Sequence, residues 1–157
     1  MALEARVYCN CFEAGKLLIP PPRPDQVYVA EDGGLGCTEL YHLYEFEEWL
    51  EKYACSHVGG VALQHHLGSP GVVAFLREEL ERTAEDFSVL LRKVLYDANH
   101  SGDYLLVEDL KALLAETIHL SVLHSDDAEE ENLLRNFERQ LKELITCAIQ
   151  MRKPIVF

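Results

Sequence analysis

The sequence has no long hydrophobic run, no excess of basic residues and no regular set of paired cysteines. No stretch approaches the ~18 consecutive apolar residues of a membrane span, and the opening residues MALEARVYC lack the basic and apolar regions of an export signal. We therefore expect a soluble protein with no membrane partner. The five cysteines are odd in number and lack dense spacing, which indicates reduced thiols in a cytoplasmic setting rather than a secreted disulfide scaffold.

Acidic residues dominate the charge of the chain. There are 27 Asp and Glu against 14 Lys and Arg, which gives a net charge of −13 over 157 residues. A surface of this sign repels nucleic acid and anionic lipid and attracts basic surfaces. We therefore expect a basic protein as partner and no nucleic acid. The length fits a single globular domain over residues 1–157.

The hydrophobic spacing indicates an α+β fold. Apolar and polar residues alternate from Leu3 to Cys11, as in a half-buried strand, and QVYVA offers a second strand closed by the turn EDGGLG. The C-terminal KPIVF offers a short strand that would pair beside the first. Apolar stripes at helical spacing predict helices that begin near Leu43, Pro70, Thr83, Leu106 and Asp126. The segments that begin at Pro70 and Thr83 form either two helices or one bent helix. The prediction is a small N-terminal sheet, with or without the C-terminal strand, packed against four or five helices.

The segment DANHSGDYLLVE, residues 97–108, resembles the calcium-binding loop of the EF-hand family. That loop carries oxygen ligands at positions 1, 3, 5 and 12 and a glycine at position 6. Gly102 occupies the glycine position. The oxygen-bearing positions are Asp97, Asn99, Ser101 and Glu108.

The residues around this loop depart from the family pattern. Tyr104 stands where a small branched aliphatic residue is usual, and Leu105 stands where a polar side chain commonly reaches the ion. The apolar stripe of the following helix begins at Leu110, one residue later than the family pattern, and no second loop is present to pair with. A shift of one residue turns a helix face by about 100°. We therefore expect a polar turn between two helices and no calcium site.

Cysteines and histidines form a candidate metal site. Thiolate and imidazole groups are zinc ligands, so the set would admit zinc if the fold brought its segments together. The spacing departs from the usual Cys-x2–4-Cys pairs of zinc sites. The alternative is that the cysteine packs in the core while the histidines cap helices or line a polar surface. The candidate ligands are Cys55, His57, His65, His66, His100 and Asp103.

Cys9 and Cys11 can be interpreted in two ways, as core residues or as metal ligands. Both fall on the same strand parity as the apolar residues before them, which favours small core residues. The alternative is that the pair binds a metal together with Cys37 or Cys55.

The stretches CNCFEAGK, CSHVGG and HSGDYL resemble stretches of small uncharacterised bacterial proteins. The resemblance implies a bacterial cytosolic setting and brings no activity with it. The leading hypothesis is a non-enzymatic acidic interaction module, such as an adaptor or an immunity-like protein that neutralises a toxin. The alternative is a metal-dependent protein or enzyme built on Cys55, His57, His65 and His66, so the question of catalysis stays open at this point.

Overall fold

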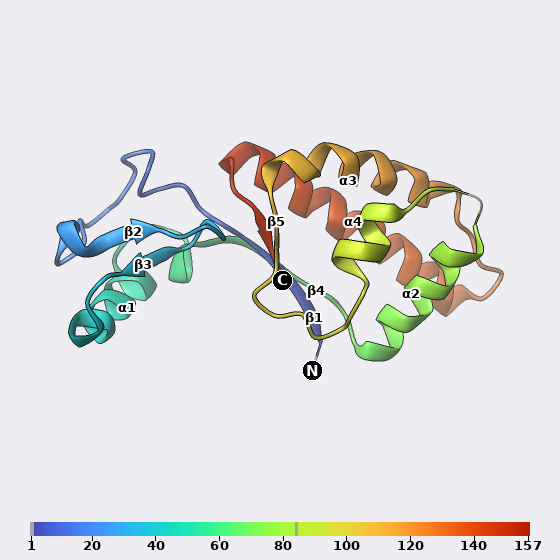
Figure 1. Cartoon of the computed structure of the whole chain (residues 1–157), viewed down its shortest axis with the longest axis horizontal. Helices are drawn as coiled ribbons and strands as arrows, with labels where there is room; N and C mark the ends of the chain where they lie inside the picture. The colour runs from blue at the N-terminus through green and yellow to red at the C-terminus, as the bar shows by residue number, and fades with distance from the viewer. Residues whose placement is uncertain (1, 84) are drawn as a thin grey trace.

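The chain folds into two lobes joined by a long pair of strands, as the computed structural model of residues 2–83 and 85–157 shows (Figure 1). The main lobe combines a four-stranded antiparallel sheet, in the order β4-β1-β6-β5, with three of the helices. The outer lobe, residues 9–60, contains a separate two-stranded hairpin and one helix. The predicted α+β fold is confirmed.

The elements are short apart from one helix. The main sheet contains β1 (Leu3–Tyr8), β4 (Val61–Gly68), β5 (Tyr104–Leu105) and β6 (Ile155–Val156). The hairpin contains β2 (Val27–Val29) and β3 (Leu35–Cys37). The α-helices are α1 (Leu43–Lys52), α2 (Pro70–Arg82), α3 (Val107–His119) and α4 (Ala128–Met151).

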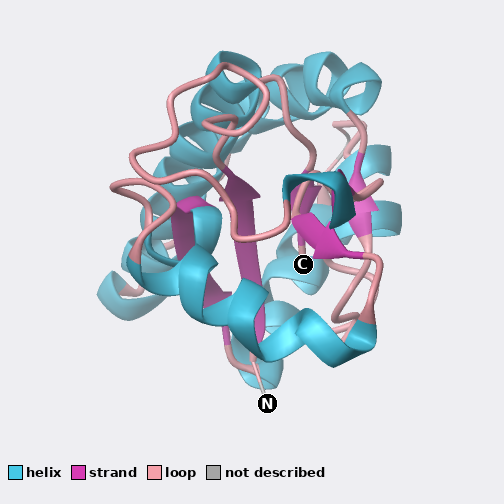
Figure 2. Ribbon diagram, turned by 90° about the vertical axis from the view of Figure 1, so that its left-hand side faces the viewer, coloured by secondary structure: helices cyan, strands magenta, loops and turns pink. Residues whose placement is uncertain are grey.

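Strand β1 lies at the centre of the main sheet. Its apolar parity is buried as predicted, with Leu3, Ala5 and Val7 all at most 2% exposed. The antiparallel partner β4 runs along nearly its whole length, and Val156 of β6 pairs with Arg6 on the other side. The C-terminal segment therefore joins the sheet beside the first strand, as predicted. A view turned by 90° shows the helices packed around these strands (Figure 2).

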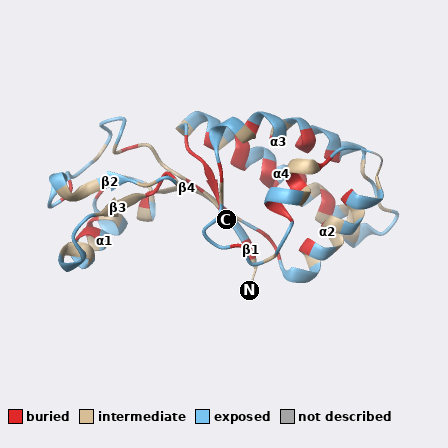
Figure 3. Cartoon of the chain, viewed as in Figure 1, coloured by how far each residue is buried: buried red, intermediate tan, exposed pale blue. Residues whose placement is uncertain are grey.

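Helix α4 supplies much of the main core. Its predicted apolar stripe is buried, and buried residues gather where the helices meet the sheet (Figure 3). The carboxylate of Asp127 accepts hydrogen bonds from the backbone N–H groups of Glu129 and Glu130, at 2.9 and 3.0 Å. Asp127 therefore caps the helix, and the expected cap at Asp126 is one residue too early. No helix of the described ranges is long and apolar enough to cross a membrane.

Three segments differ in detail from the sequence prediction. Residues 61–68, for which the sequence pattern predicts no definite element, form the eight-residue strand β4. The segment expected to form a helix after Thr83 shortens to one helical turn and a π-helix over Leu90–Val94. Its join to α2 includes residue 84, which lies outside the described residues. Strand β2 exists as predicted but pairs with β3 and stays apart from the main sheet.

A buried lysine ties the outer lobe to the end of the chain. Lys153 is 4% exposed and donates hydrogen bonds to the backbone oxygen of Gly33, at 2.7 Å, and to the carboxylate of Glu13. Gly33 lies in the β2–β3 turn with a φ of +88°, a conformation that favours glycine. A buried ammonium needs such partners because its desolvation is costly. Lys153 therefore fixes two loops of the outer lobe against the main lobe.

We predict that Lys153→Met lowers the free energy of unfolding by about 1–3 kcal/mol, since Gly33 and Glu13 lose their hydrogen-bond donor while the aliphatic packing is kept. Urea unfolding followed by circular dichroism measures the change. Lys111→Met is the matched control, because Lys111 is exposed and such changes stay within about 0.5 kcal/mol. Equal stability of the two variants would contradict the proposed tie.

Candidate metal centre

Four side chains of metal-ligand type meet where the outer lobe joins the main sheet. Cys9 and Cys11 follow the end of β1, and Cys55 and His57 precede the start of β4. Because β1 and β4 are antiparallel partners, the end of one lies beside the start of the other. One ligand atom from each of the four residues lies within 4.8 Å of the other three.

The distances within this cluster match a tetrahedral metal site. The sulfur atoms of Cys9 and Cys55 lie 3.8 Å apart. The Nδ1 atom of His57 lies 3.4 Å from the sulfur of Cys11 and 3.8 Å from that of Cys55. Zinc bonds of about 2.3 Å to sulfur and about 2.0–2.1 Å to nitrogen place tetrahedral ligand atoms roughly 3.5–3.8 Å from one another. Three of the six distances between ligand atoms therefore match a tetrahedral zinc site, and the other three are at most 4.8 Å.

Tight turns present the first pair of ligands. The chain leaves the sheet after Tyr8, and the backbone N–H of Cys9 still donates to Gly60 O at 2.8 Å. The backbone oxygen of Cys11 then accepts a hydrogen bond from Lys16 at 2.8 Å, which closes a turn. This turn carries Cys11 back toward β4.

The second pair lies in the connection from α1 to β4. The backbone N–H groups of Tyr53 and Ala54 both donate to the oxygen of Trp49 and end the helix. A second turn follows, in which Gly60 donates to the oxygen of His57 at 3.0 Å. Gly59 has a φ of +62° there, a value that side-chain-bearing residues rarely adopt. The turn places the ligand pair directly before β4.

Burial keeps the metal-free thiols protonated. It raises the pKa of Cys9 to about 12 and also raises the pKa of Cys11. Cys11 is buried, while Cys9 and Cys55 are half-buried. A divalent cation reverses this preference because it binds the thiolate and displaces the proton. Without a metal, the thiols of Cys9 and Cys11 therefore stay neutral.

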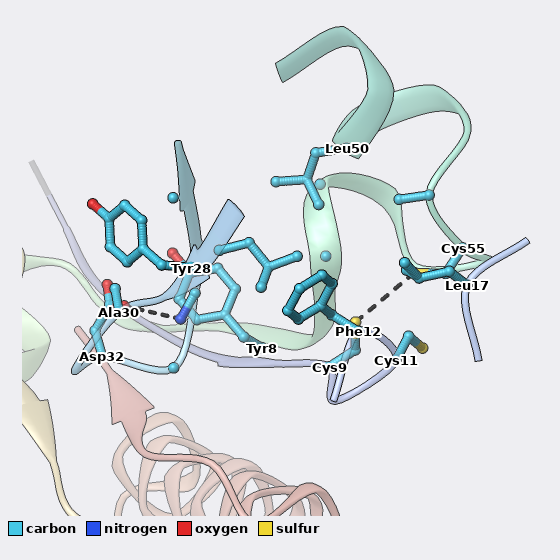
Figure 4. A pocket seen from close by; sticks show the side chains of 17 residues that line it. Tyr8, Cys9, Cys11, Phe12, Leu17, Tyr28, Ala30, Asp32, Leu50 and Cys55 are labelled. Atoms are coloured by element: carbon cyan, nitrogen blue, oxygen red, sulfur yellow. Dashed lines mark hydrogen bonds between the residues drawn. The ribbon is translucent and has the colours of Figure 1, made fainter. Parts of the chain in front are cut away.

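Three cysteines of the cluster line one end of a cavity of about 240 Å³ (Figure 4). The hairpin forms the opposite end, where the carboxylate of Asp32 accepts a hydrogen bond from the N–H of Gly34 at 2.9 Å. The rings of Tyr8, Phe12 and Tyr28 also line the cavity. The cluster therefore borders a mostly apolar space inside the outer lobe.

Two of the six candidate ligands from the sequence, Cys55 and His57, belong to the cluster. The ring of His65 instead lies 2.7 Å from the carboxylate of Glu143 on α4. His66, the next residue of β4, stands opposite Glu4 of β1. Neither of these two histidines is a member of the cluster.

His100 and Asp103 also lie outside the cluster. The buried ring of His100 packs between those of Tyr96 and Phe157. Its Nε2 lies 2.8 Å from the backbone oxygen of Val94, and its Nδ1 lies 3.7 Å from Asp103. This histidine is placed by the core of the main lobe.

Cys9 and Cys11 belong to the cluster, although the sequence pattern favours a role in the core for both. The strand ends at Tyr8, so the alternation of faces does not extend to Cys11. Of the two partners left open, Cys55 meets them, whereas Cys37 packs beside Phe46 and contacts Glu39 O. The available signal is the matching spacing of two pairs, C-x-C at 9–11 and C-x-H at 55–57.

The EF-hand-like loop forms the expected polar turn. Asp97 accepts a hydrogen bond from the N–H of Asn99 at 3.1 Å, and Gly102 has a φ of +96°. The N–H of Gly102 donates to Phe157 O at 2.7 Å, so the loop is fastened to the C-terminal strand. Helix α3 begins directly after Leu106, as the turn interpretation predicts, and Glu108 lies exposed in its first turn.

We predict that zinc binding releases protons, because the thiols of Cys9 and Cys11 have a raised pKa and are protonated at neutral pH. With three thiols in the cluster, the apparent affinity rises with pH, by up to about a thousandfold per pH unit below the thiol pKa values. Calorimetric titration with zinc in two buffers of different ionisation enthalpy counts the protons. An observed enthalpy that does not depend on the buffer would contradict thiolate coordination.

No known protein family, curated protein or solved structure matches this chain. The features of the chain that bear on function are the chemistry of the cluster and the surface of the lobe that contains it.

Proposed function

We propose that the protein is a non-enzymatic interaction module whose outer lobe is held in shape by a structural zinc ion. The observation that carries this proposal is a set of three thiols and one imidazole whose ligand atoms all lie within 4.8 Å of one another, from Cys9, Cys11, Cys55 and His57. Three of the distances between these atoms are 3.4–3.8 Å, as in a tetrahedral site. Structural zinc sites have four protein ligands, whereas catalytic sites keep one position open for water or substrate. A site filled by four side chains supports folding rather than a reaction.

The outer lobe has a small core, so it gains most from such an ion. Phe46, Trp49 and Ala54 are its fully buried members, whereas the main lobe buries more than twenty apolar residues. A core of that size is marginal without a metal or a covalent crosslink. Zinc would join the end of α1 to the end of β1 and so anchor the lobe on the main sheet.

The charge of the chain supports a basic protein as the partner. A net charge of −13 speeds association with a positively charged surface and disfavours association with nucleic acid. The cysteines are free of disulfides, as metal ligation by sulfur requires, which fits the reducing cytoplasm expected for this chain. An adaptor or an immunity-like protein that neutralises a basic toxin would use these properties.

The cavity beside the cluster favours a second candidate, a metal-dependent enzyme. Catalysis would require one of the four ligands to leave the zinc ion and a substrate to enter from the cavity. The four side chains already satisfy the tetrahedron, and the described lining contains one carboxylate, Asp32, which is occupied with the hairpin turn. The structural role is the one that the geometry favours.

Removal of zinc is expected to loosen the outer lobe while the main lobe stays folded. Trp49 is the only tryptophan of the chain, is 4% exposed, and donates a hydrogen bond to Ile19 O at 2.9 Å. Chelation should therefore shift its fluorescence emission to longer wavelength, since its surroundings become more aqueous. Amide hydrogen exchange should rise in residues 9–60 and stay slow in β1 and α4. Unchanged emission after complete loss of zinc would contradict the structural role.

Substitution of a ligand should reproduce the effect of chelation. Cys55→Ser is expected to weaken zinc binding by more than about 100-fold. The loss of a residue that only supports a ligand costs up to about 100-fold in affinity, and the loss of the ligand itself costs more. Cys37→Ser is the matched control, because this cysteine belongs to the same lobe but lies outside the cluster. Competition with a fluorescent zinc chelator measures both affinities. Equal losses in the two variants would mean that the cluster is not the binding site.

A further inference from the structure

The outer lobe contains the most exposed large apolar side chains of the described residues. Tyr41 is 96% exposed and Tyr44 is 79% exposed. Solvated aromatic groups of this size mark interaction sites when they gather on one face. The five most exposed large apolar residues of the described chain all lie in this lobe: Leu18, Leu40, Tyr41, Tyr44 and Val58.

Helix α1 and the turn before it arrange two of these tyrosines in line with acidic groups. Residues three and four apart share a helix face, so Tyr41, Tyr44, Glu47 and Glu51 form one stripe. The opposite face carries the buried Phe46 and Trp49. We call the stripe of Tyr41, Tyr44, Glu47 and Glu51 the tyrosine–glutamate face. It has no partner within the described chain, because the core of the lobe lies on the other side.

A groove of about 510 Å³ runs along this face. Tyr44, Glu47 and Glu51 line one side, and Gly59 of the turn before β4 lines the other. Gly59 has no atom within 4 Å of where a side chain would begin, so the groove is open at this turn. The zinc ligand His57 lies two residues earlier, and the cluster therefore sets the position of the groove wall.

The groove is acidic, because Glu47, Glu48 and Glu51 line it together with one lysine, Lys52. Between Glu39 and Lys52 the chain has five glutamates and one lysine. Lys52 is occupied by Glu48, at 3.0 Å, and Glu45 pairs with an arginine at 3.4 Å. Glu47 and Glu51 have no ion-pair partner among the described residues. Two solvated carboxylates beside two solvated aromatic rings form a surface that selects cationic side chains.

We infer that the tyrosine–glutamate face binds an arginine-rich segment of a partner protein. An arginine stacks on the ring of Tyr44 and forms a planar ion pair with Glu47 or Glu51. A smaller cation, such as an ammonium group, makes these two contacts less well. A second copy of this chain would bring the same glutamates against one another. The inference rests on the proposed function, because α1 is positioned by the lobe that zinc holds together.

The experiment maps a cationic probe onto the zinc-loaded full chain. A synthetic peptide of alternating arginine and alanine is titrated into isotopically labelled protein, with a glutamate–alanine peptide as the control for charge. We expect backbone resonance shifts confined to α1, the turn at Gly59 and the preceding turn at Tyr41. Shifts spread over the acidic helices of the main lobe, or no shifts, would overturn the inference.

Variants separate this face from the general acidity of the protein. Tyr44→Ala, and separately the pair Glu47→Gln and Glu51→Gln, should each lower the affinity for the arginine peptide, the pair by about tenfold. The matched control is the pair Glu78→Gln and Glu81→Gln, which removes the same charge from the exposed face of α2. Equal losses in the two double variants would overturn the inference.

The two proposals fail in different ways. If the protein holds zinc and keeps Trp49 buried but does not bind the arginine peptide, the inference is overturned and the structural role of zinc is unaffected. A protein that holds no zinc, yet shows peptide-induced resonance shifts at the same residues of α1, contradicts the structural zinc and supports the binding face.

Discussion

The antiparallel pairing of β1 with β4 is the constraint on which the rest of the structure depends. It joins the first strand to a segment about 60 positions later and forms the centre of the main sheet. Beyond Tyr8 and before Val61 the two chains are no longer strands, and at that point Cys9 and Cys11 meet Cys55 and His57. Residues 9–60 therefore form a long segment between the two strands, and both of its ends lie at the cluster. Closing so long a loop costs chain entropy, and a metal crosslink at its base lowers that cost most effectively.

The two lobes are stabilised by different physical means. The main lobe packs β1, Leu67 of β4 and the stripe of α4 around a continuous apolar core, which is enough for a chain of this size. The outer lobe relies on the small core around Trp49, on Lys153, and in our account on the zinc cluster. This division leaves α1 free to expose aromatic and acidic groups, because the lobe does not need that face for its own packing. The proposed binding face and the buried face that stabilises the lobe thus lie on opposite sides of one short helix.

Local patterns in the sequence predict much of the main lobe. The alternation from Leu3 to Val7, the Ser69–Pro70 start of α2 and the spacing of α4 are properties of neighbouring residues, and all appear in the structure. The cluster depends instead on a long-range pairing that no local pattern encodes. His65 and His66 are close enough to His57 in the sequence to be ligands of the same metal. In the structure they lie further along β4, paired with residues of β1 and away from the cluster. Cys9 and Cys11 look like strand residues because the end of a strand is harder to read than its interior. The one local sign of the cluster in the sequence is the equal spacing of two pairs, Cys9 with Cys11 and Cys55 with His57.

The central claim is that zinc occupies a site of three sulfur atoms and one nitrogen atom. X-ray absorption at the zinc edge, on protein purified without chelators or added metal, tests it directly. The account predicts stoichiometric zinc with three sulfur neighbours at about 2.3 Å and one nitrogen neighbour at about 2.0–2.1 Å. A shell dominated by oxygen, or protein that contains no metal and does not take up zinc, would contradict it.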